Sequence, residues 1–231
     1  MKLYYAPASS YSQRVLIALY EKNIDFIPIQ VNLFEARSRE DYIQINPFAK
    51  IPTLIADSGQ VLFEACIIIE YLDEDFKNEP RLIPDDSNLA LEVRFWERIL
   101  DVYINSGREA LFADTQRPAE ERGNKEVLKA KRLLETACTL LDARLQGRTW
   151  LVGEQFSLAD CAAAPILAYL RMVYNYQHLP LLTDYVRRLE SRPSVAQVQH
   201  QGNEQMKQML ATLKYPLDLV PIDTYRTSVI A

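Results

Sequence analysis

Strand patterns are confined to the first third of this 231-residue chain, and this restriction limits its possible folds more than any other feature. Four short apolar runs predict strands, at 2–6, 26–31, 52–56 and 60–63. Helical patterns lie at 9–23 and 65–75, and every later pattern is helical. The order strand, helix, strand, loop, strand, strand, helix predicts one small mixed sheet with helices packed on it. We therefore expect an α/β half followed by a larger all-helical bundle.

The two halves are expected to be separate domains. A polar, proline-containing segment at 77–86 is typical of a linker, which places an α/β domain at 1–76 and a helical domain at 87–213. The last stretch, 214–231, is interrupted by two prolines, so we expect an extended tail there.

Local patterns add detail to both domains. The run 26–31 is almost continuously apolar, which predicts a strand covered on both faces. The charged segment 37–43 predicts a weak helix or a loop. Apolar residues at spacings of three and four along 126–145 predict a bundle helix with one apolar stripe. Ser157 and Asp160 have the spacing of a capping box, which predicts the start of a helix.

The composition argues against several functional classes. A formal net charge of −5 disfavours broad binding to nucleic acid or to anionic membranes, since both depend on many Lys and Arg contacts. With only two histidines and three widely spaced cysteines, a metal site, a disulfide framework and a Ser/His/Asp triad are all disfavoured. We expect Cys66, Cys138 and Cys161 to be buried thiols. No run suits a signal peptide or a spanning helix, so we expect a cytoplasmic protein that does not bind membranes.

The start of the first predicted helix is the first candidate for chemistry. In a thioredoxin-like βαβ unit, redox proteins place Cys-x-x-Cys here, where the helix dipole favours a thiolate. This chain has Ser9-Ser10-Tyr11-Ser12 instead and cannot exchange disulfides itself. Its hydroxyls and free amides could stabilise the thiolate of a ligand. The alternative is that Ser9 only caps the helix.

Two further positions lie at the ends of predicted elements. Pro52 begins the third strand, where thioredoxin-like proteins keep a cis peptide bond that turns the preceding backbone, here Ile51, toward an extended peptide. A trans proline at the start of a strand is the alternative. Glu64 directly precedes the helix 65–75, where a carboxylate could bind a ligand ammonium group beside free amides. Its alternative role is to cap its own helix.

Together these motifs resemble the glutathione transferase superfamily, in particular its serine-type phi, zeta and theta-like members. The resemblance spans about residues 1–213, and five segments carry it: 7–19, 46–54, 63–72, 156–160 and 191–193. It implies a thioredoxin-like, glutathione-binding domain followed by an all-helical domain, with glutathione as co-substrate and no metal.

The resemblance also implies roles for single residues. Ser9 would stabilise the glutathione thiolate, with Ser10 as the alternative because theta-like members use the next serine. Ile51, before Pro52, would bind the cysteinyl backbone, and Glu64 the γ-glutamyl amine. The glycine carboxylate would fall to basic side chains: Lys50, with Arg37 or Arg39.

One position departs from the pattern. The family usually has a serine after the glutamate, whose hydroxyl holds the γ-glutamyl carboxylate, but this chain has Ala65. Glutathione affinity is therefore expected to be reduced, unless another group such as Arg14 or a partner-subunit side chain binds the carboxylate.

Three functions follow from the resemblance. The first is a glutathione transferase that joins glutathione to a small hydrophobic electrophile, with detoxification as its role. The electrophile would lie against aromatic side chains of the helical domain: Phe95, Tyr103, Phe112, Tyr169 and Tyr174. The second is a non-catalytic regulator that binds RNA polymerase, because the helix at 9–23 and the segment 156–165 are similar to stringent starvation protein A. The third is a zeta-like maleylacetoacetate isomerase, although Tyr11 stands where that class has cysteine.

The resemblance finally implies a twofold homodimer. In the family, the N-terminal domain of one subunit pairs with two helices of the other. The apolar stripe at 126–145 and the predicted helix at 89–111 would offer that surface.

Overall fold

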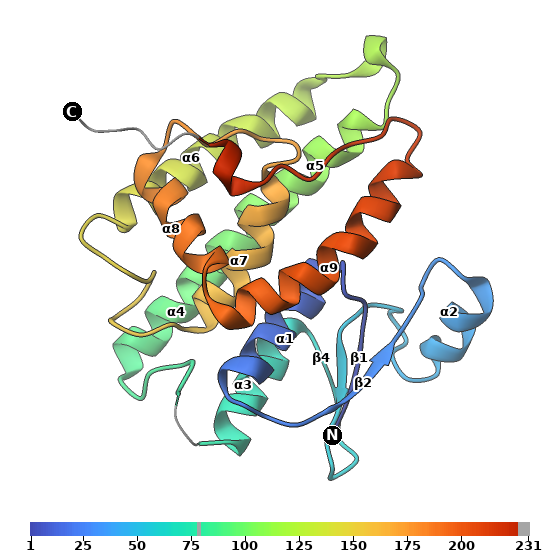
Figure 1. Cartoon of the computed structure of the whole chain (residues 1–231), viewed down its shortest axis with the longest axis vertical. Coiled ribbons are helices and arrows are strands. Elements are labelled where there is room, and N and C mark those ends of the chain that lie inside the picture. The colour runs from blue at the N-terminus through green and yellow to red at the C-terminus, as the bar shows by residue number, and fades with distance from the viewer. Residues whose placement is uncertain (78–79, 226–231) are drawn as a thin grey trace.

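The computed structural model of the chain describes residues 1–77 and 80–225. Within these residues, strands form a sheet below a larger group of helices (Figure 1). The strands are β1 (Lys2–Tyr5), β2 (Ile27–Gln30), β3 (Thr53–Ile55) and β4 (Val61–Phe63). Their order is β2-β1-β3-β4, with β1 parallel to β2 and antiparallel to β3. This is the small mixed sheet that the sequence predicts.

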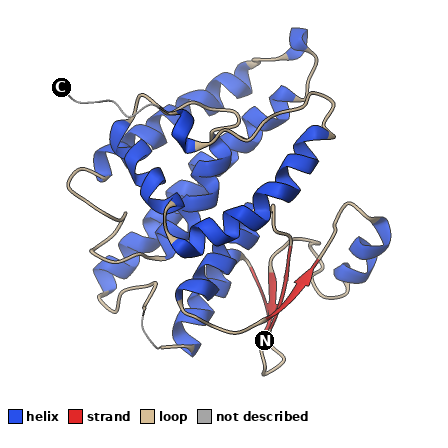
Figure 2. Ribbon diagram, viewed as in Figure 1, coloured by secondary structure: helices blue, strands red, loops and turns tan. Residues whose placement is uncertain are grey.

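Three helices belong to the sheet domain. α1 (Ser10–Glu21) and α3 (Ala65–Asp75) pack against each other on the side of the sheet that faces the helical domain (Figure 2). α1 ends where Asn23 takes a positive φ of 51°, a conformation that asparagine tolerates better than most residues. α2 (Ala36–Ile43) lies apart, beside β2 (Figure 1), and Tyr42 is its one buried residue.

The second domain is helical throughout its described part. A continuous helical stretch begins with α4 (Ser87–Ile99), passes through a π-helical segment (Leu100–Asn105) and ends with α5 (Ser106–Thr115). Four more helices follow: α6 (Lys125–Arg144), α7 (Leu158–Leu170), α8 (Pro180–Glu190) and α9 (Pro193–Ala211). α1 packs against both α7 and α9, so it is the main contact between the domains. The fold class is therefore a thioredoxin-like α/β domain followed by an all-helical domain, as predicted.

The predicted patterns of the helical domain are present. The apolar stripe of α6 is buried from Val127 to Leu145. At the start of α7, the carboxylate of Asp160 accepts hydrogen bonds from the Ser157 amide at 2.9 Å and from the Ser157 hydroxyl at 2.8 Å. Because the α6 stripe packs inside the subunit, the expectation that it offers a dimer surface is wrong.

The prediction for β2 is wrong in one respect. This strand was expected to be covered on both faces, but Ile27 is 56% exposed and the strand has no fully buried residue. The reason is its place in the sheet: β2 is an edge strand, and α2 does not cover it. Continuous apolar sequence was here a poor guide to burial, because it does not distinguish an edge strand from a central one.

The segments after α3 and after α9 both make specific contacts with the rest of the protein. Asp73 in α3 accepts hydrogen bonds from the amides of Leu82 and Ile83, both of which are buried. Beyond α9 the chain makes a short helical turn at Ile222–Thr224, and Tyr225 packs into the core. The expected extended tail is therefore wrong for this turn, because its apolar side chains bury themselves on α8.

The predicted domain boundaries at 76, 87 and 213 stay a prediction, and the rest of the linker and tail, 78–79 and 226–231, lies outside the described residues. No helix in the described ranges combines the length and apolarity that crossing a membrane requires.

Candidate active site

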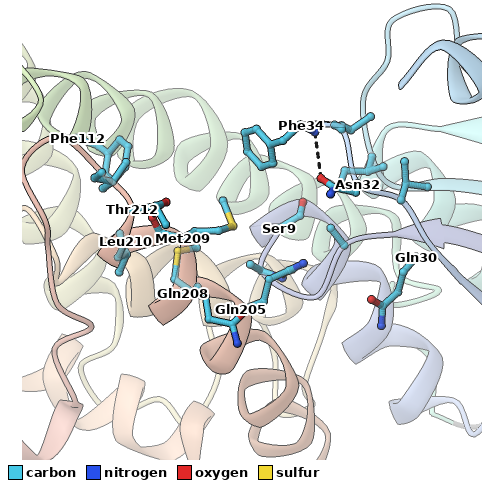
Figure 3. A pocket seen from close by; sticks show the side chains of 17 residues that line it. Ser9, Gln30, Asn32, Phe34, Phe112, Gln205, Gln208, Met209, Leu210 and Thr212 are labelled. Carbon is cyan, nitrogen blue, oxygen red and sulfur yellow. Dashed lines mark hydrogen bonds between the residues drawn. The ribbon is translucent and has the colours of Figure 1, made fainter. Parts of the chain in front are cut away.

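A cavity of about 790 Å³ lies between the two domains, beside the start of α1. Its sheet-domain wall comes from the loop that carries Ser9, from the last residue of β2 and the loop 31–34 that follows it, and from Ile51. Its other wall is the C-terminal part of α9, together with Phe112 of α5 (Figure 3). The cavity thus brings together segments from both ends of the chain.

Ser9 is positioned by the start of α1. It is the N-cap residue, with extended backbone (φ −76°, ψ 119°), and its hydroxyl oxygen accepts a hydrogen bond from the Ser12 amide at 3.2 Å. A serine hydroxyl that accepts one bond still has its proton to donate. The capping role and the thiolate-binding role are therefore compatible, and the positive end of the helix dipole favours an anion at this point.

Ser10 is placed differently from Ser9. It is the first residue of α1, its side chain is 7% exposed, and it does not line the cavity. Ser9 does line it. A ligand in the cavity would therefore meet the Ser9 hydroxyl first.

Ile51 also lines the cavity, and the peptide bond between Ile51 and Pro52 is cis. The predicted cis bond is thus present. Within the described part of the chain, the amide and carbonyl groups of Ile51 make no hydrogen bond. They remain available to pair with the backbone of a peptide ligand.

A buried polar cluster fixes the loop before Ile51. The amide nitrogen of Asn46 donates to the carbonyl oxygen of Lys50 at 2.8 Å and to the Thr53 hydroxyl at 3.0 Å. The Tyr42 hydroxyl donates to the same Lys50 carbonyl at 2.8 Å. Neither Asn46 nor Tyr42 was predicted as a site residue. Asn46 lies in the 46–54 segment that carries the family resemblance, and its hydrogen-bonding side chain was the signal that could have identified it.

Glu64 and Ala65 stand at the start of α3 with contrasting surroundings. Glu64 is exposed, makes no capping bond to its helix, and has an unusual positive φ of 72°. A non-glycine residue in this region costs roughly 1–3 kcal/mol, and such residues cluster at functional sites. Glu64 occupies the N-cap position of α3, but because its side chain makes no capping bond, the alternative that its carboxylate caps this helix is wrong. Ala65, by contrast, is only 3% exposed, so its Cβ does not face open solvent.

The basic candidates do not line this cavity. Lys50 is exposed, and its carbonyl group, not its ammonium group, accepts the hydrogen bonds from Tyr42 and Asn46 that hold the loop. Arg37, on α2, lines a separate hollow between α2 and β2. Arg39 is exposed on the same helix. The sequence-predicted site residues thus divide into a group at the cavity, Ser9 and Ile51, and a group outside its lining.

The α9 wall was missed by the sequence analysis. Gln205, Met206, Gln208 and Met209 line the cavity from this helix. Of the aromatic side chains expected to receive an electrophile, Phe112 alone lines it, whereas Tyr169 is buried and Phe95 and Tyr103 are exposed elsewhere. None of the described residues that line the cavity is charged. The cavity therefore suits a neutral, largely apolar molecule.

Arg14 lies behind the site and is already paired. Its guanidinium group is 3.2 Å from the carboxylate of Glu97 and 2.9 Å from that of Asp101, and its side chain is 2% exposed. It stacks on the ring of Tyr11, with the guanidinium carbon 4.3 Å from the ring centre. Burial and Asp101 raise the pKa of Tyr11 to about 12, so this phenol is protonated at neutral pH. Arg14 therefore joins α1 to the helical domain and does not point into the cavity as a free cation.

The three cysteines are free thiols. Cys138 and Cys161 are buried as expected, whereas Cys66 is half-buried. Burial raises the pKa of Cys66, raises that of Cys138 to about 12, and raises that of Cys161 well above its ordinary value. None of them has the low pKa of a catalytic thiolate. Any thiolate chemistry at this site would have to use a ligand's sulfur.

Comparison with known proteins places this geometry in a family. The family model for the N-terminal domain of glutathione S-transferase matches residues 3–80. The family model for its C-terminal domain matches residues 103–193. The chain is 27% identical to glutathione S-transferase GstA of Escherichia coli O157:H7, over 84% of this chain and 95% of that protein. It is 33% identical to a stringent starvation protein A homolog of Coxiella burnetii, over 78% and 79% of the two chains.

A solved structure extends the comparison to three dimensions. A glutathione S-transferase from Methylobacillus flagellatus, crystallised with glutathione bound, superposes with a TM-score of 0.75. It is 30% identical in sequence, and the match covers 85% of this chain and 98% of that one.

Proposed function

The chain belongs to the glutathione S-transferase family, and from this premise we propose that it is a glutathione transferase that conjugates glutathione to a neutral hydrophobic electrophile. The observation that carries the proposal is the position of Ser9. Its hydroxyl stands at the positive end of α1 and faces an uncharged cavity, beside the unpaired backbone of Ile51.

In the proposed reaction, Ser9 acts on the sulfur of glutathione. The hydroxyl donates a hydrogen bond that favours the thiolate over the thiol. Lowering the thiol pKa from near 9 to about 7 raises the thiolate-to-thiol ratio roughly a hundredfold, equivalent to about 2.7 kcal/mol. The thiolate fraction at pH 7 then rises from about 1% to about 50%. The thiolate then forms a carbon–sulfur bond with the electrophile. A leaving group departs with its bonding electrons, or the resulting anion takes a proton from solvent.

The binding roles in this proposal are those of the family pattern. The backbone of Ile51, preceding Pro52, pairs with the cysteinyl unit, and the exposed carboxylate of Glu64 binds the γ-glutamyl amine. Lys50 and Arg37 take part in binding the glycine carboxylate, which requires their side chains to move toward the ligand, since neither lines the cavity. Position 65 contributes backbone only, because alanine has no hydroxyl.

The second substrate is proposed to occupy the wall formed by α9 and Phe112. Methionine side chains are flexible and polarisable, so a pocket with Met206 and Met209 adapts to molecules of different shape. The lack of charge along the described lining supports neutral substrates. It disfavours the isomerase alternative, because a dicarboxylate substrate needs cationic partners.

A matched pair of electrophiles tests the proposal. A neutral chlorodinitrobenzene and a chloronitrobenzoate react by the same displacement but differ in charge. We expect glutathione-dependent turnover of the neutral compound. Two nitro groups activate it more strongly, so each kcat/KM is divided by the compound's uncatalysed rate with glutathione, and this ratio should be at least about tenfold lower for the anionic one. Absence of turnover across neutral aryl halides, epoxides and activated alkenes, at millimolar glutathione, would refute the enzyme assignment.

One observation favours a second candidate, a regulator resembling stringent starvation protein A. Ala65 lacks the hydroxyl expected to hold glutathione, and a homolog of that protein is 33% identical to this chain. A glutathione-affinity column separates the two candidates: retention and elution with free glutathione support the enzyme, and flow-through supports the regulator.

The proposal includes a homodimer and a cytoplasmic role in detoxification. Large apolar side chains remain exposed on both domains, as a dimer of the family type requires. They include Phe48, Val61, Ile67, Leu91, Phe95 and Tyr103. Sedimentation at micromolar concentration should give twice the mass of one 26.7 kDa chain. A monomer mass would refute the dimer.

A further inference from the structure

α9 of the helical domain contacts the loop that carries Ser9 directly. The side-chain oxygen of Gln205 accepts a hydrogen bond from the Ala8 amide at 2.9 Å. Ala8 itself is 6% exposed, so this bond is largely shielded from water. One turn earlier, α9 has Gly202, which leaves room for the same loop. Residues almost 200 positions apart in the sequence are therefore joined at the candidate active site. Figure 3 shows Gln205 on the wall of the cavity that Ser9 also lines.

The loop is held from both sides. From α1, the side-chain nitrogen of Gln13 donates to the carbonyl oxygen of Pro7 at 2.8 Å and to the Tyr169 hydroxyl at 2.8 Å. From α9, the side-chain oxygen of Gln205 accepts a hydrogen bond from the N–H of the same peptide group, the one between Pro7 and Ala8. Ser9 lies one residue further along, so the direction of its hydroxyl depends on the orientation of this peptide group.

We propose that Gln205 is a positioning residue for the Ser9 hydroxyl. The inference rests on the proposed transferase function and extends it to a residue of the helical domain. Gln205 holds the N–H of the Pro7–Ala8 peptide, whose carbonyl Gln13 holds, and this peptide orients the hydroxyl relative to the glutathione sulfur. Without the bond, the hydroxyl samples other directions, its hydrogen bond to the thiolate weakens, and the pKa of the bound thiol rises.

The same helix supplies a matched control. Gln208 lines the same cavity as Gln205, but its side chain makes no hydrogen bond in the described structure. Replacing each glutamine by methionine keeps the length of the side chain and removes the amide. Gln205→Met therefore deletes the contact to Ala8, whereas Gln208→Met changes only the polarity of the cavity wall.

The measurement is the pKa of enzyme-bound glutathione, followed by the ultraviolet absorbance of the thiolate, together with the pH profile of kcat/KM. We expect Gln205→Met to raise the thiol pKa by about 1, and to lower kcat/KM about tenfold at neutral pH. The rate should recover toward wild type at pH values above the raised pKa. Gln208→Met should keep the wild-type pKa, and both variants should bind glutathione within about threefold of wild type.

Three outcomes overturn the inference in distinguishable ways. An unchanged thiol pKa in Gln205→Met, with an active wild type, refutes the positioning role alone. An equal loss of rate at every pH, with a lower unfolding midpoint, shows a purely structural contact. If the wild-type protein itself forms no bound thiolate, the proposed function fails and this inference fails with it. Gln205→Ala, which removes the same acceptor, provides a second variant should Gln205→Met not fold.

Discussion

Gly202 approaches the Pro7 peptide so closely that a Cβ atom at position 202 would lie 2.6 Å from the Pro7 carbonyl oxygen. The same Cβ would lie 2.2 Å from the side-chain nitrogen of Gln13. Both distances are shorter than a van der Waals contact, so only glycine fits while α9 and the Ser9 loop keep their positions. This close approach of α9 to the active-site loop therefore requires glycine at position 202.

Gly202→Ala should separate α9 from this loop. We expect a loss of about 1–3 kcal/mol in the free energy of unfolding, because the added methyl group displaces a backbone carbonyl as well as a side chain. Chemical denaturation measures the effect. Gln197→Ala, at an exposed position of the same helix, is the control and should change stability by less than about 0.5 kcal/mol. Equal stability of Gly202→Ala and wild type would show that α9 moves freely relative to the loop.

Asn46 should prove essential to the loop that presents Ile51. Asn46→Ala leaves the partly buried Lys50 carbonyl and the buried Thr53 hydroxyl each with one partner fewer, and it also removes the acceptor of the Phe48 amide. We expect a stability loss of about 2–3 kcal/mol and weaker glutathione binding by calorimetric titration. Asn175→Ala, which removes an exposed turn bond to the Gln177 amide, should cost less than about 1 kcal/mol. Similar losses in the two variants would contradict the special role of Asn46.

Ala65 is the position where this chain departs from the expected pattern of serine after the glutamate. Ala65→Ser restores a hydroxyl whose bond to a carboxylate is worth about 1.5–3 kcal/mol, so glutathione binding should tighten about tenfold or more. This gain requires the serine hydroxyl to point from the first turn of α3 toward the ligand, because position 65 is otherwise buried, with Ala65 only 3% exposed. Titration calorimetry of both forms decides the question. An unchanged dissociation constant would mean that backbone amides or a partner-subunit side chain hold the carboxylate, since Arg14 is already paired with two carboxylates.

The cysteines should be poorly reactive in the folded protein. An unperturbed thiol with pKa near 9 is about 1% thiolate at pH 7, and raised pKa values lower this fraction further. A disulfide reagent should therefore label Cys66 slowly at pH 7. Below the pKa of Cys66, the labelling rate should rise about tenfold for each increase of 1 in pH. Cys138 and Cys161 should be labelled only after unfolding. Cys66→Ser should abolish labelling of the folded form and leave conjugation unchanged. Rapid labelling at pH 7 would contradict the raised pKa values.

The sequence predicted those parts of the site that depend on neighbouring residues. Ser9 at a helix start, the cis bond before Pro52 and Glu64 ahead of α3 are each determined within a few positions of the chain. The burial of the α6 stripe was predictable for the same reason, because helical periodicity is local. The mixed sheet followed from the order of the elements.

Other features depend on long-range packing, which periodicity does not encode. Nothing near Gln205 in the sequence shows that its oxygen meets the Ala8 amide, and nothing near β2 shows that it lies at a sheet edge. Arg14 has the spacing of a polar helix position, but it is buried because two carboxylates of the helical domain neutralise it. Such residues could be found only once the two domains were placed together.

The substitution Ser9→Ala, compared with Ser10→Ala, tests the central assignment most directly. Ser9→Ala should lower kcat for glutathione conjugation about ten- to a thousandfold, as loss of one oxyanion donor does in other enzymes, with a much smaller effect on glutathione binding. Because Ser9 also caps α1, the variant should lose about 0.5–2 kcal/mol of stability, and Ser9→Thr, which keeps a hydroxyl, should retain most of both. Ser10 lies buried away from the cavity, so Ser10→Ala should keep kcat within about threefold of wild type. A large loss in Ser10→Ala with an active Ser9→Ala would contradict the account and assign the thiolate to Ser10.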